Sequence, residues 1–212
     1  MKVVAFNGSP RKEGNTAKAL QIVMKQLEDA GIETEMVHVG KEQIRGCVAC
    51  MGCLKKQDEC CVLKDDPVNE WIQKMKKADG ILIGSPVYFA GVAGTMKAFL
   101  DRAFFVTGVN GVMLRHKVGA AVVAVRRSGG LPTFHGLNHY IQYQEMLIPS
   151  TNYWNVAHGM MPGELEKDEE GVQIMEVLGK NMAWLMRLVE HGKEAIPAPE
   201  PCRKVLTNFV RP

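Results

Sequence analysis

Cysteines are concentrated in one short stretch of this 212-residue chain. Cys47, Cys50 and Cys53 follow one another at intervals of three residues, and Cys60 comes next with Cys61 directly behind it. A turn with this spacing can direct several thiolates at one point, and thiolates are ligands of soft metals and iron–sulfur clusters. The stretch therefore predicts a metal or redox centre held by several of these cysteines.

A second candidate site lies near the N-terminus, between an apolar run and a helical pattern. Residues 7–20 read NGSPRKEGNTAKAL, in which glycines permit a tight turn and the start of a helix presents free N–H groups. Ser9, Asn15 and Thr16 add side-chain donors, and Arg11 adds a charged fork. The loop therefore predicts a phosphate-monoester site, with a generic polar turn before a capped helix as the alternative. It has neither the Gly-Lys-Ser/Thr ending of a nucleoside-triphosphatase loop nor the Gly-x-Gly-x-x-Gly pattern of a dinucleotide fingerprint.

The elements that must position these residues follow from the hydrophobic pattern. Apolar runs predict buried strands, and apolar side chains at spacings of three or four predict helices. The expected strands are residues 2–6, 33–39, 80–84, 117–125 and, less clearly, 149–157; the expected helices are residues 15–30, a helix that starts at 66–67, 91–106 and 170–191. This alternation predicts an α/β fold with a flavodoxin-like, doubly wound, five-stranded parallel sheet and helices on both faces. Ligands of such sheets bind beyond the carboxyl ends of the strands, which points to the loops after residues 6, 84 and 125.

Two of these loops resemble those of a known family. GSPRKEGNT, residues 8–16, is similar to the FMN-phosphate loop of the flavodoxin-like NADPH-dependent FMN reductases. GSPVYFAGVAGTMKAFLDR, residues 84–102, is similar to that family's second flavin-contacting loop and the helix after it. The resemblance covers roughly residues 1–190. It implies that FMN is bound, with Ser9, Arg11, Asn15 and Thr16 around its phosphate.

The resemblance also implies which residues border the flavin ring. A flat apolar ring fits against proline and aromatic surfaces, with backbone groups at its polar edge. In residues 123–133, VAVRRSGGLPT, an arginine near the ring would stabilise the anionic reduced flavin, and either Arg126 or Arg127 suits that role. Ordinary core aromatics and solvated arginines are the alternatives. The implied ring contacts are Pro86, Val87, Tyr88, Phe89, Gly91, Arg126, Ser128 and Gly129.

The cysteine stretch resembles one branch of the same family, the iron–sulfur flavoproteins. Their compact motif matches Cys47-x2-Cys50-x2-Cys53-x6-Cys60, and CVLKDD at residues 61–66 is similar as well. The resemblance implies a [4Fe–4S] cluster close to FMN, with Cys47, Cys50, Cys53 and Cys60 as its ligands. Cys61 leaves open which of the two adjacent cysteines is the fourth ligand, and Cys60 is preferred. A zinc site, free thiols and a disulfide are the alternatives.

Composition and length set the remaining expectations. A net charge of +3 is too small to indicate a nucleic-acid or membrane partner, and no apolar stretch approaches the ~20 residues of a membrane span. The N-terminus lacks the layout of a signal peptide, so we expect a cytoplasmic protein. In a reducing cytosol, clustered cysteines bind metals or act in redox chemistry. One domain is expected over residues 1–191, with the cysteine loop at 47–61, followed by a proline-rich tail at 192–212 that is either loose or wrapped on a neighbouring subunit.

Together these features predict an FMN-containing oxidoreductase that passes electrons between NAD(P)H or a ferredoxin-like donor, a [4Fe–4S] cluster and FMN. No protein nucleophile or essential acid–base residue is expected, because the cofactors carry the chemistry. Two alternatives are an NAD(P)H-dependent FMN or quinone reductase without iron, and a non-catalytic electron carrier, which the positive net charge disfavours. The resemblance further implies flavin sites at the subunit interfaces of a homodimer or homotetramer.

Overall fold

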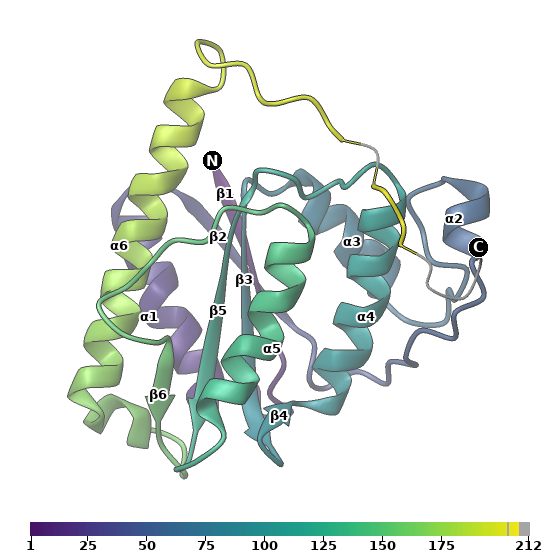
Figure 1. Ribbon diagram of the computed structural model, residues 1–212. Coiled ribbons are helices and arrows are strands. Elements are labelled where there is room, and N and C mark those ends of the chain that lie inside the picture. Colours follow the sequence, from purple (N-terminus) through teal and green to yellow (C-terminus); the bar gives the residue numbers. More distant parts are fainter. Residues whose placement is uncertain (203, 208–212) are drawn as a thin grey trace.

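The structure is a computed structural model that describes residues 1–202 and 204–207. A parallel sheet forms its centre, in the order β2-β1-β3-β5-β6 (Figure 1). The strands are β1 (Lys2–Asn7), β2 (Glu33–His38), β3 (Gly80–Tyr88), β5 (Val118–Val125) and β6 (Val156–His158). A two-residue strand, β4 (Gly91–Val92), pairs antiparallel with the end of β3. The predicted flavodoxin-like parallel sheet is confirmed.

The inner strands β3 and β5 are apolar because both of their faces are covered. Every residue of β5 is buried, and so is β3 from Gly80 to Ser85. Parallel strands covered on both sides need such continuous apolar runs, whereas half-exposed strands alternate. The register sets Ala5 of β1 beside Leu82 of β3, and Leu82 beside Ala120 of β5. The carboxyl ends of these strands therefore meet at one edge of the sheet.

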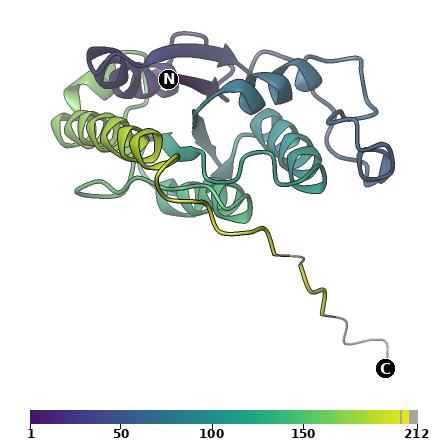
Figure 2. The same cartoon turned by 90° about the horizontal axis from the view of Figure 1, so that it is seen from above.

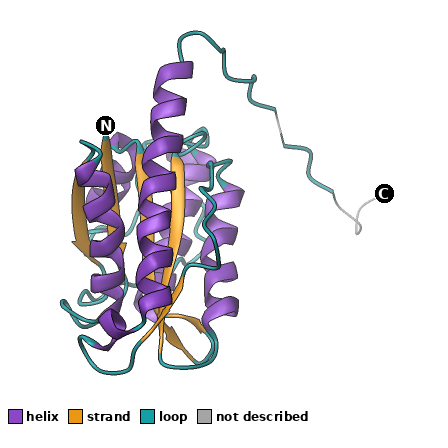
Figure 3. Cartoon of the chain, turned by 90° about the vertical axis from the view of Figure 1, so that its left-hand side faces the viewer, coloured by secondary structure: helices purple, strands orange, loops and turns teal. Residues whose placement is uncertain are grey.

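Helices cover both faces of the sheet (Figures 1 and 2). Figure 3 shows two long helices side by side in front of the sheet, and they share one apolar core with that face. Three longer helices, together with Cys53 of the cysteine segment, share the second core on the opposite face. The first pair is α1 (Asn15–Asp29) and α6 (Glu169–Gly192), and the second set is α3 (Val68–Lys77), α4 (Gly94–Val109) and α5 (Gly130–Tyr143).

Two elements differ in extent from the sequence expectations. The helix expected over residues 91–106 begins at Gly94, because the chain first makes a tight hairpin into β4. The strand expected over residues 149–157 is confined to Val156–His158. A short 3-10 helix, η1 (Glu164–Lys167), lies between this strand and α6. The helix that starts at Val68 agrees with the expected start signal, since Asp66 Oδ1 accepts the Val68 N–H at 3.2 Å.

The expectations contain no helix at residues 130–143, where α5 lies. In the sequence GLPTFHGLNHYIQY, two glycines besides the first-turn proline and several polar or aromatic residues interrupt the apolar spacing that predicts a helix. Thr133, Leu137 and Ile141 are nonetheless buried at helical spacing. Pro132 is tolerated because it lies in the first turn, where its missing N–H would have no partner within the helix.

The cysteine-bearing segment lies outside the two main helical layers. Residues 41–66 contain one short helix, α2 (Gly52–Lys56), which lies beyond α3 and α4 at the right of Figure 1. After α6, residues 193–202 and 204–207 form no helix or strand and extend away from the sheet (Figures 2 and 3). The rest of the predicted tail, residues 203 and 208–212, lies outside the described residues. Among the helices of the described part, none is both long and apolar enough to cross a membrane.

Candidate functional site

The loop after β1 is held in place by its neighbours. Asn7 Oδ1 accepts the Ser9 N–H at 3.0 Å, and Ser9 Oγ accepts the Arg11 N–H at 3.2 Å. The Asn7 carbonyl accepts the N–H groups of Val39 and Gly40, which follow β2, at 2.9 and 3.1 Å. A Cβ atom at Gly40 would lie 2.2 Å from the Ser9 carbonyl carbon, so glycine is required for this close approach. The loop that carries Ser9 and Arg11 is therefore preformed.

The first turn of α1 presents backbone donors that no side chain of the described residues caps. Gly14 occupies the N-cap position, and the first turn contains no acidic residue. Free N–H groups at a helix start, together with the helix dipole, attract anions. Asn15 and Thr16 lie in this turn, and Thr16 is buried. These donors suit a phosphate group.

The donors face a cavity of about 170 Å³ at the carboxyl edge of the sheet. Its walls come from the loop after β1 with the start of α1, from the ends of β3 and β5, and from the loop after β6. The lining residues are Ser9, Pro10, Arg11, Gly14, Asn15, Thr16, Pro86, Val87, Tyr88, Ala124, Arg126, Gly159 and Met160. The structure thus brings the three predicted loops to one cavity.

Most of the predicted flavin-binding residues line this cavity, but some do not. Phe89, Gly91, Ser128 and Gly129 are absent from its walls. Conversely, Gly159 and Met160 line it without having been predicted, as do Pro10, Gly14 and Ala124. The rule about strand ends applies to the loop after β6 as well. The weak apolar pattern of residues 149–157 leaves the end of that strand poorly defined in the sequence.

The turn after β3 turns aromatic side chains outward. Phe89 and Ala90 have φ angles of +49° and +56°, and Gly91 pairs with Tyr88 across the hairpin. The Phe89 side chain is fully exposed, and Tyr88 is about half exposed. The alternative that these are core aromatics is therefore wrong. Tyr88 contributes to the cavity wall, whereas Phe89 stands at the tip of the turn.

Gly129 allows the loop after β5 to pack on the hairpin. Its φ angle is +90°, and a Cβ atom there would lie 2.7 Å from Ala90 Cα and 3.0 Å from Val87 Cγ1. Gly129 and Arg127 line a separate cavity of about 370 Å³. Arg126, and not its neighbour Arg127, therefore faces the cavity that holds the phosphate-loop donors.

Four cysteines line one small cavity between α2 and α4. They are Cys47, Cys50, Cys53 and Cys61. Cys60, the preferred fourth ligand in the sequence analysis, is partly buried but is not among the lining residues. Burial raises the pKa of the Cys53 thiol, and the sulfur atoms of Cys61 and Cys47 raise it further.

The arrangement of the thiols bears on which metal group they could hold. In residues 1–202 and 204–207, no three His, Cys, Asp or Glu side chains are close enough to bind a single metal ion. A structural zinc site also needs four ligands, which must surround one ion, so zinc stays an alternative. A four-iron cluster binds each cysteine through a different iron atom, which holds the sulfur atoms farther apart. Cys47, Cys50, Cys53 and Cys61 around one cavity supply the number and kind of ligands that such a cluster needs.

The backbone of the cysteine segment is also unusual. Ala49, Met51, Gln57 and Glu59 all have left-handed φ angles between 51° and 59°, although none is glycine. Such conformations persist where surrounding contacts hold them, and they gather at functional sites. The cysteine cavity shares no lining residue with the cavity at the sheet edge. The chain therefore has two separate candidate sites.

The sheet order and the loops at its carboxyl edge define a flavodoxin-like α/β protein. An archaeal flavodoxin has the same fold, with a TM-score of 0.57 and 14% identity, over 88% of this chain and 99% of that one. RosB, solved with bound 8-demethyl-8-formylriboflavin-5'-phosphate, has a TM-score of 0.71 and 16% identity, over 100% of this chain and 93% of its own. At these identities the similarity establishes the fold alone.

Sequence comparison defines the family. Residues 1–160 match the profile of the family described as NADPH-dependent FMN reductase. An iron–sulfur flavoprotein of Methanocaldococcus jannaschii is 34% identical over 197 residues, which cover 90% of this chain and 100% of that protein. The chain therefore belongs to the NADPH-dependent FMN reductase family, in its iron–sulfur flavoprotein branch. Its class is that of the flavoprotein oxidoreductases.

Proposed function

We propose that this protein is an FMN-dependent oxidoreductase that passes electrons between NAD(P)H or a ferredoxin-like donor, a [4Fe–4S] cluster and FMN. When bound, FMN and such a cluster supply the exchange of one or two electrons. The residues of the chain bind these groups, orient them and adjust their charge environment. The observation that carries the proposal is the meeting of three flavin-type loops at one cavity, together with four cysteines around another.

The FMN phosphate is assigned to the loop after β1 and the first turn of α1. The free N–H groups of Asn15 and Thr16 and the hydroxyl of Ser9 provide neutral donors, and the Arg11 guanidinium provides a charged one. Asn15 Oδ1 is buried, and no described residue donates a hydrogen bond to it. A hydroxyl of the FMN sugar chain would supply the missing donor.

The flavin ring is assigned to the other walls of the same cavity. Pro86, Val87 and Tyr88 provide an apolar and aromatic surface. Arg126 provides a cation that favours negative charge on the polar edge of the reduced ring. Predicted ring contacts that do not line the cavity lie on the same two loops, and they stay predictions: Phe89, Gly91, Ser128 and Gly129.

The cluster is assigned to Cys47, Cys50, Cys53 and one of the adjacent pair Cys60 and Cys61. All five lie in one segment that packs against α4, and the first three line a shared cavity. Thiolates are the preferred ligands of iron–sulfur clusters. The number of cysteines suffices for four ligands with one to spare.

The test is an anaerobic visible spectrum with iron, sulfide and FMN quantified per chain. About four irons and one FMN per chain are expected after reconstitution. Reduction of the bound flavin by NADH, NADPH or reduced ferredoxin would then identify the donor. FMN without iron would contradict the cluster, and the absence of both groups would contradict the whole proposal.

A flavin reductase without iron is the second candidate function. The exposure of Cys47 and Cys50 favours it, since solvent-facing thiols need not hold a cluster. In that case wild type and Cys50→Ala would contain no iron and would oxidise NAD(P)H equally well. Iron in wild type that is lost in Cys50→Ala would exclude this candidate.

A further inference from the structure

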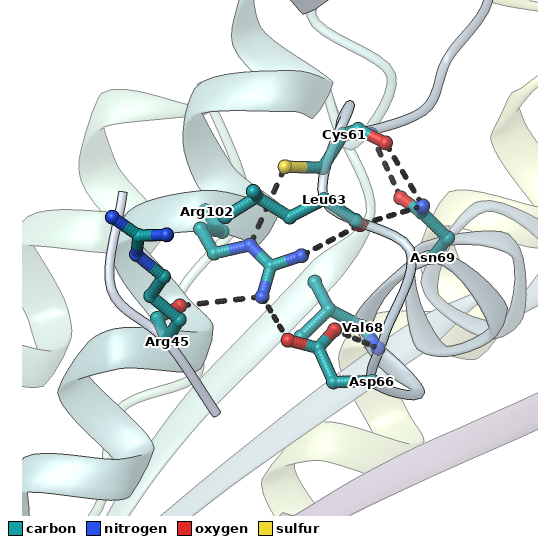
Figure 4. A network of polar contacts seen from close by, with 7 residues as sticks. All are labelled: Arg45, Cys61, Leu63, Asp66, Val68, Asn69 and Arg102. Atoms are coloured by element: carbon teal, nitrogen blue, oxygen red, sulfur yellow. Dashed lines mark hydrogen bonds and ion pairs between the residues drawn. The ribbon is translucent and has the colours of Figure 1, made fainter. Parts of the chain in front are cut away.

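Arg102 of α4 is a buried cation whose partners all come from the cysteine segment. Its side chain has 0% exposure, and it forms an ion pair with the nearly buried Asp66 (Figure 4). Its Nη1 also donates to the Arg45 carbonyl at 3.2 Å, and its Nη2 donates to the Leu63 carbonyl at 3.0 Å. Its Nε donates to the Cys61 sulfur at 3.4 Å. The guanidinium thus ties residues 45–66 to α4 and directs one N–H at a thiol.

Cys61 is held on its backbone side as well. Asn69 of α3 accepts the Cys61 N–H through Oδ1 at 2.7 Å and donates to the Cys61 carbonyl through Nδ2 at 3.0 Å (Figure 4). The same amide donates to the Leu63 carbonyl at 3.3 Å. Two helices therefore fix Cys61, α3 through its backbone and α4 through its sulfur.

Cys60 has no comparable support within the described part of the chain. The hydrogen bond found for it there runs from its N–H to Asp58 Oδ1, two residues earlier, at 3.2 Å. Its side chain does not line the cavity that Cys47, Cys50 and Cys53 share, whereas Cys61 and Arg102 both do. The two adjacent cysteines differ in position although they are equivalent in sequence spacing.

We propose that Cys61, and not Cys60, supplies the fourth sulfur of the iron–sulfur centre, and that Arg102 is the residue that positions it. The inference rests on the proposed cluster function. Residues that contact a metal ligand from outside orient that ligand. A hydrogen bond from a charged donor to a thiolate sulfur is shorter and stronger than one between neutral groups. Arg102 Nε supplies such a hydrogen bond to the Cys61 sulfur, while its charge is paired with Asp66. Hydrogen bonds and positive charge near the sulfurs favour the reduced cluster and raise its potential.

The first experiment compares Cys61→Ser with Cys60→Ser after the same anaerobic reconstitution. Cys61→Ser is expected to lose at least about half of its iron, whereas Cys60→Ser keeps about four irons per chain. FMN content reports folding in both variants, because the flavin cavity shares no residue with the cysteine cavity. Iron loss in Cys60→Ser with full iron in Cys61→Ser would overturn the proposal. A wild-type protein that binds FMN but no iron would instead overturn the cluster function itself.

The second experiment tests Arg102 with readouts that a purely structural role would not change. Arg102→Lys keeps the charge beside Asp66 but loses the Nε donor to Cys61. We expect this variant to lose iron to a chelator about tenfold faster than wild type, because removal of a partner of a metal ligand weakens metal binding by about that factor. We also expect the reduction potential of the cluster to fall. The double variant Arg102→Gln/Asp66→Asn, which removes both charges and avoids a buried unpaired one, should also have a lower potential.

Arg115→Lys serves as the matched control, because Arg115 pairs with Glu145 at 2.6 Å outside the cysteine segment. Its iron-loss rate and potential should equal those of wild type. If Arg102→Lys behaves like Arg115→Lys in both measurements, while retaining FMN and iron, Arg102 does not position a cluster ligand. The iron-loss rate is followed by a colorimetric chelator, and the potential by an electrochemical titration of the reduced-cluster signal.

Discussion

The residues of the phosphate loop are ordered before any ligand binds. Asn7 accepts the Ser9 N–H, and Gly40 packs closely against the Ser9 backbone. Gly14 leaves the first N–H groups of α1 without a side-chain cap. Donors that are already in place bind an anion with little further loss of conformational freedom. Arg11 adds the charged donor on the wall of the same cavity. Individual side chains in this loop should therefore contribute separately to FMN affinity.

We expect Arg11→Ala to weaken FMN binding by about 10- to 100-fold. A hydrogen bond to a charged group contributes about 1.5–3 kcal/mol, and the phosphate would lose one such bond. Flavin fluorescence titration measures the dissociation constant. Riboflavin, which lacks the phosphate, should bind wild type and variant equally. Lys12→Ala, an exposed neighbour outside the cavity wall, is the control. An equal loss of riboflavin and FMN affinity would contradict the phosphate assignment.

Glu35 on β2 links acid stability to two lysines. Lys74 Nζ at 2.6 Å and Lys2 Nζ at 2.9 Å hold the pKa of the Glu35 carboxyl below its ordinary value of 4.5. A carboxyl whose pKa is lower in the folded state stabilises the fold above its unfolded-state pKa. That stabilisation is lost as the pH falls through the folded-state pKa. The pair is partly exposed, which limits its contribution.

We therefore expect Glu35→Gln to lower the free energy of unfolding by about 0.5–1 kcal/mol at neutral pH. The difference from wild type should shrink as the pH falls below the ordinary value of 4.5. Urea unfolding at neutral and at acidic pH measures both quantities. Glu33→Gln, at a more exposed position that also pairs with Lys2, should have a smaller effect. If the loss in free energy of unfolding caused by Glu35→Gln grew as the pH fell, the assigned direction of the Glu35 pKa shift would be wrong.

At the scale of elements, the contact between α1 and α6 depends on one glycine. A Cβ atom at Gly179 of α6 would lie 2.6 Å from Gln26 Cβ and 2.7 Å from the Val23 carbonyl oxygen. Both atoms belong to α1 and cannot move without shifting the helix. This contact closes one face of the sheet, and the same α1 presents its first turn to the phosphate site.

Gly179→Ala should lower the free energy of unfolding by about 1–3 kcal/mol, because an added methyl group in a filled contact strains the packing. The matched control is Gly136→Ala in α5, where the nearest atom to the new Cβ is Val92 Cγ2 at 3.6 Å. That variant should be stabilised by about 0.5–1 kcal/mol, since glycine is unfavourable inside helices. Urea unfolding curves compare the two. Equal stability of both variants would contradict the role of Gly179.

At the scale of the whole molecule, both candidate sites lie before the C-terminal tail. Met160 is the last residue in the sequence that lines either of the two candidate sites, and α6 ends at Gly192. We propose that residues 1–191 form one domain and that the tail from residue 192 is an appendage. Tyr153, Trp154 and Trp184 are large and exposed, which is typical of surfaces that bind other chains. A homodimer or homotetramer therefore stays the predicted assembly.

Removal of residues 194–212 should leave the FMN and iron content per chain unchanged, because both cavities are complete without them. Sedimentation of the full chain should give the mass of a dimer or a tetramer. A smaller assembly after truncation would indicate that the tail binds a neighbouring subunit. An assembly of unchanged size would indicate that the tail is loose. Loss of FMN on truncation would contradict the domain boundary, and a monomeric full chain would contradict the predicted assembly.

Local sequence determined the features that depend on nearby residues. The runs KVVAF and KVGAAVVAV predicted strands because buried parallel strands need continuous apolar side chains. Ser9 and Thr16 could be identified because a strand end, a turn and a helix start follow one another within a few residues. The cysteine spacing marked a metal-type segment for the same reason. In each case the chemistry lies within one stretch of chain.

The tertiary structure decided which of these distant stretches meet. Arg102 contacts Cys61, which lies 41 positions earlier in the chain, and Met160 lines the same cavity as Ser9. Residue spacing cannot distinguish Cys60 from Cys61, because one step along an irregular segment turns the side chain in another direction. That direction depends on how α3 and α4 pack against the segment and on the need to pair a buried guanidinium. The sequence by itself determined which residues can bind a phosphate or a metal, and packing between distant elements decided which of them come together.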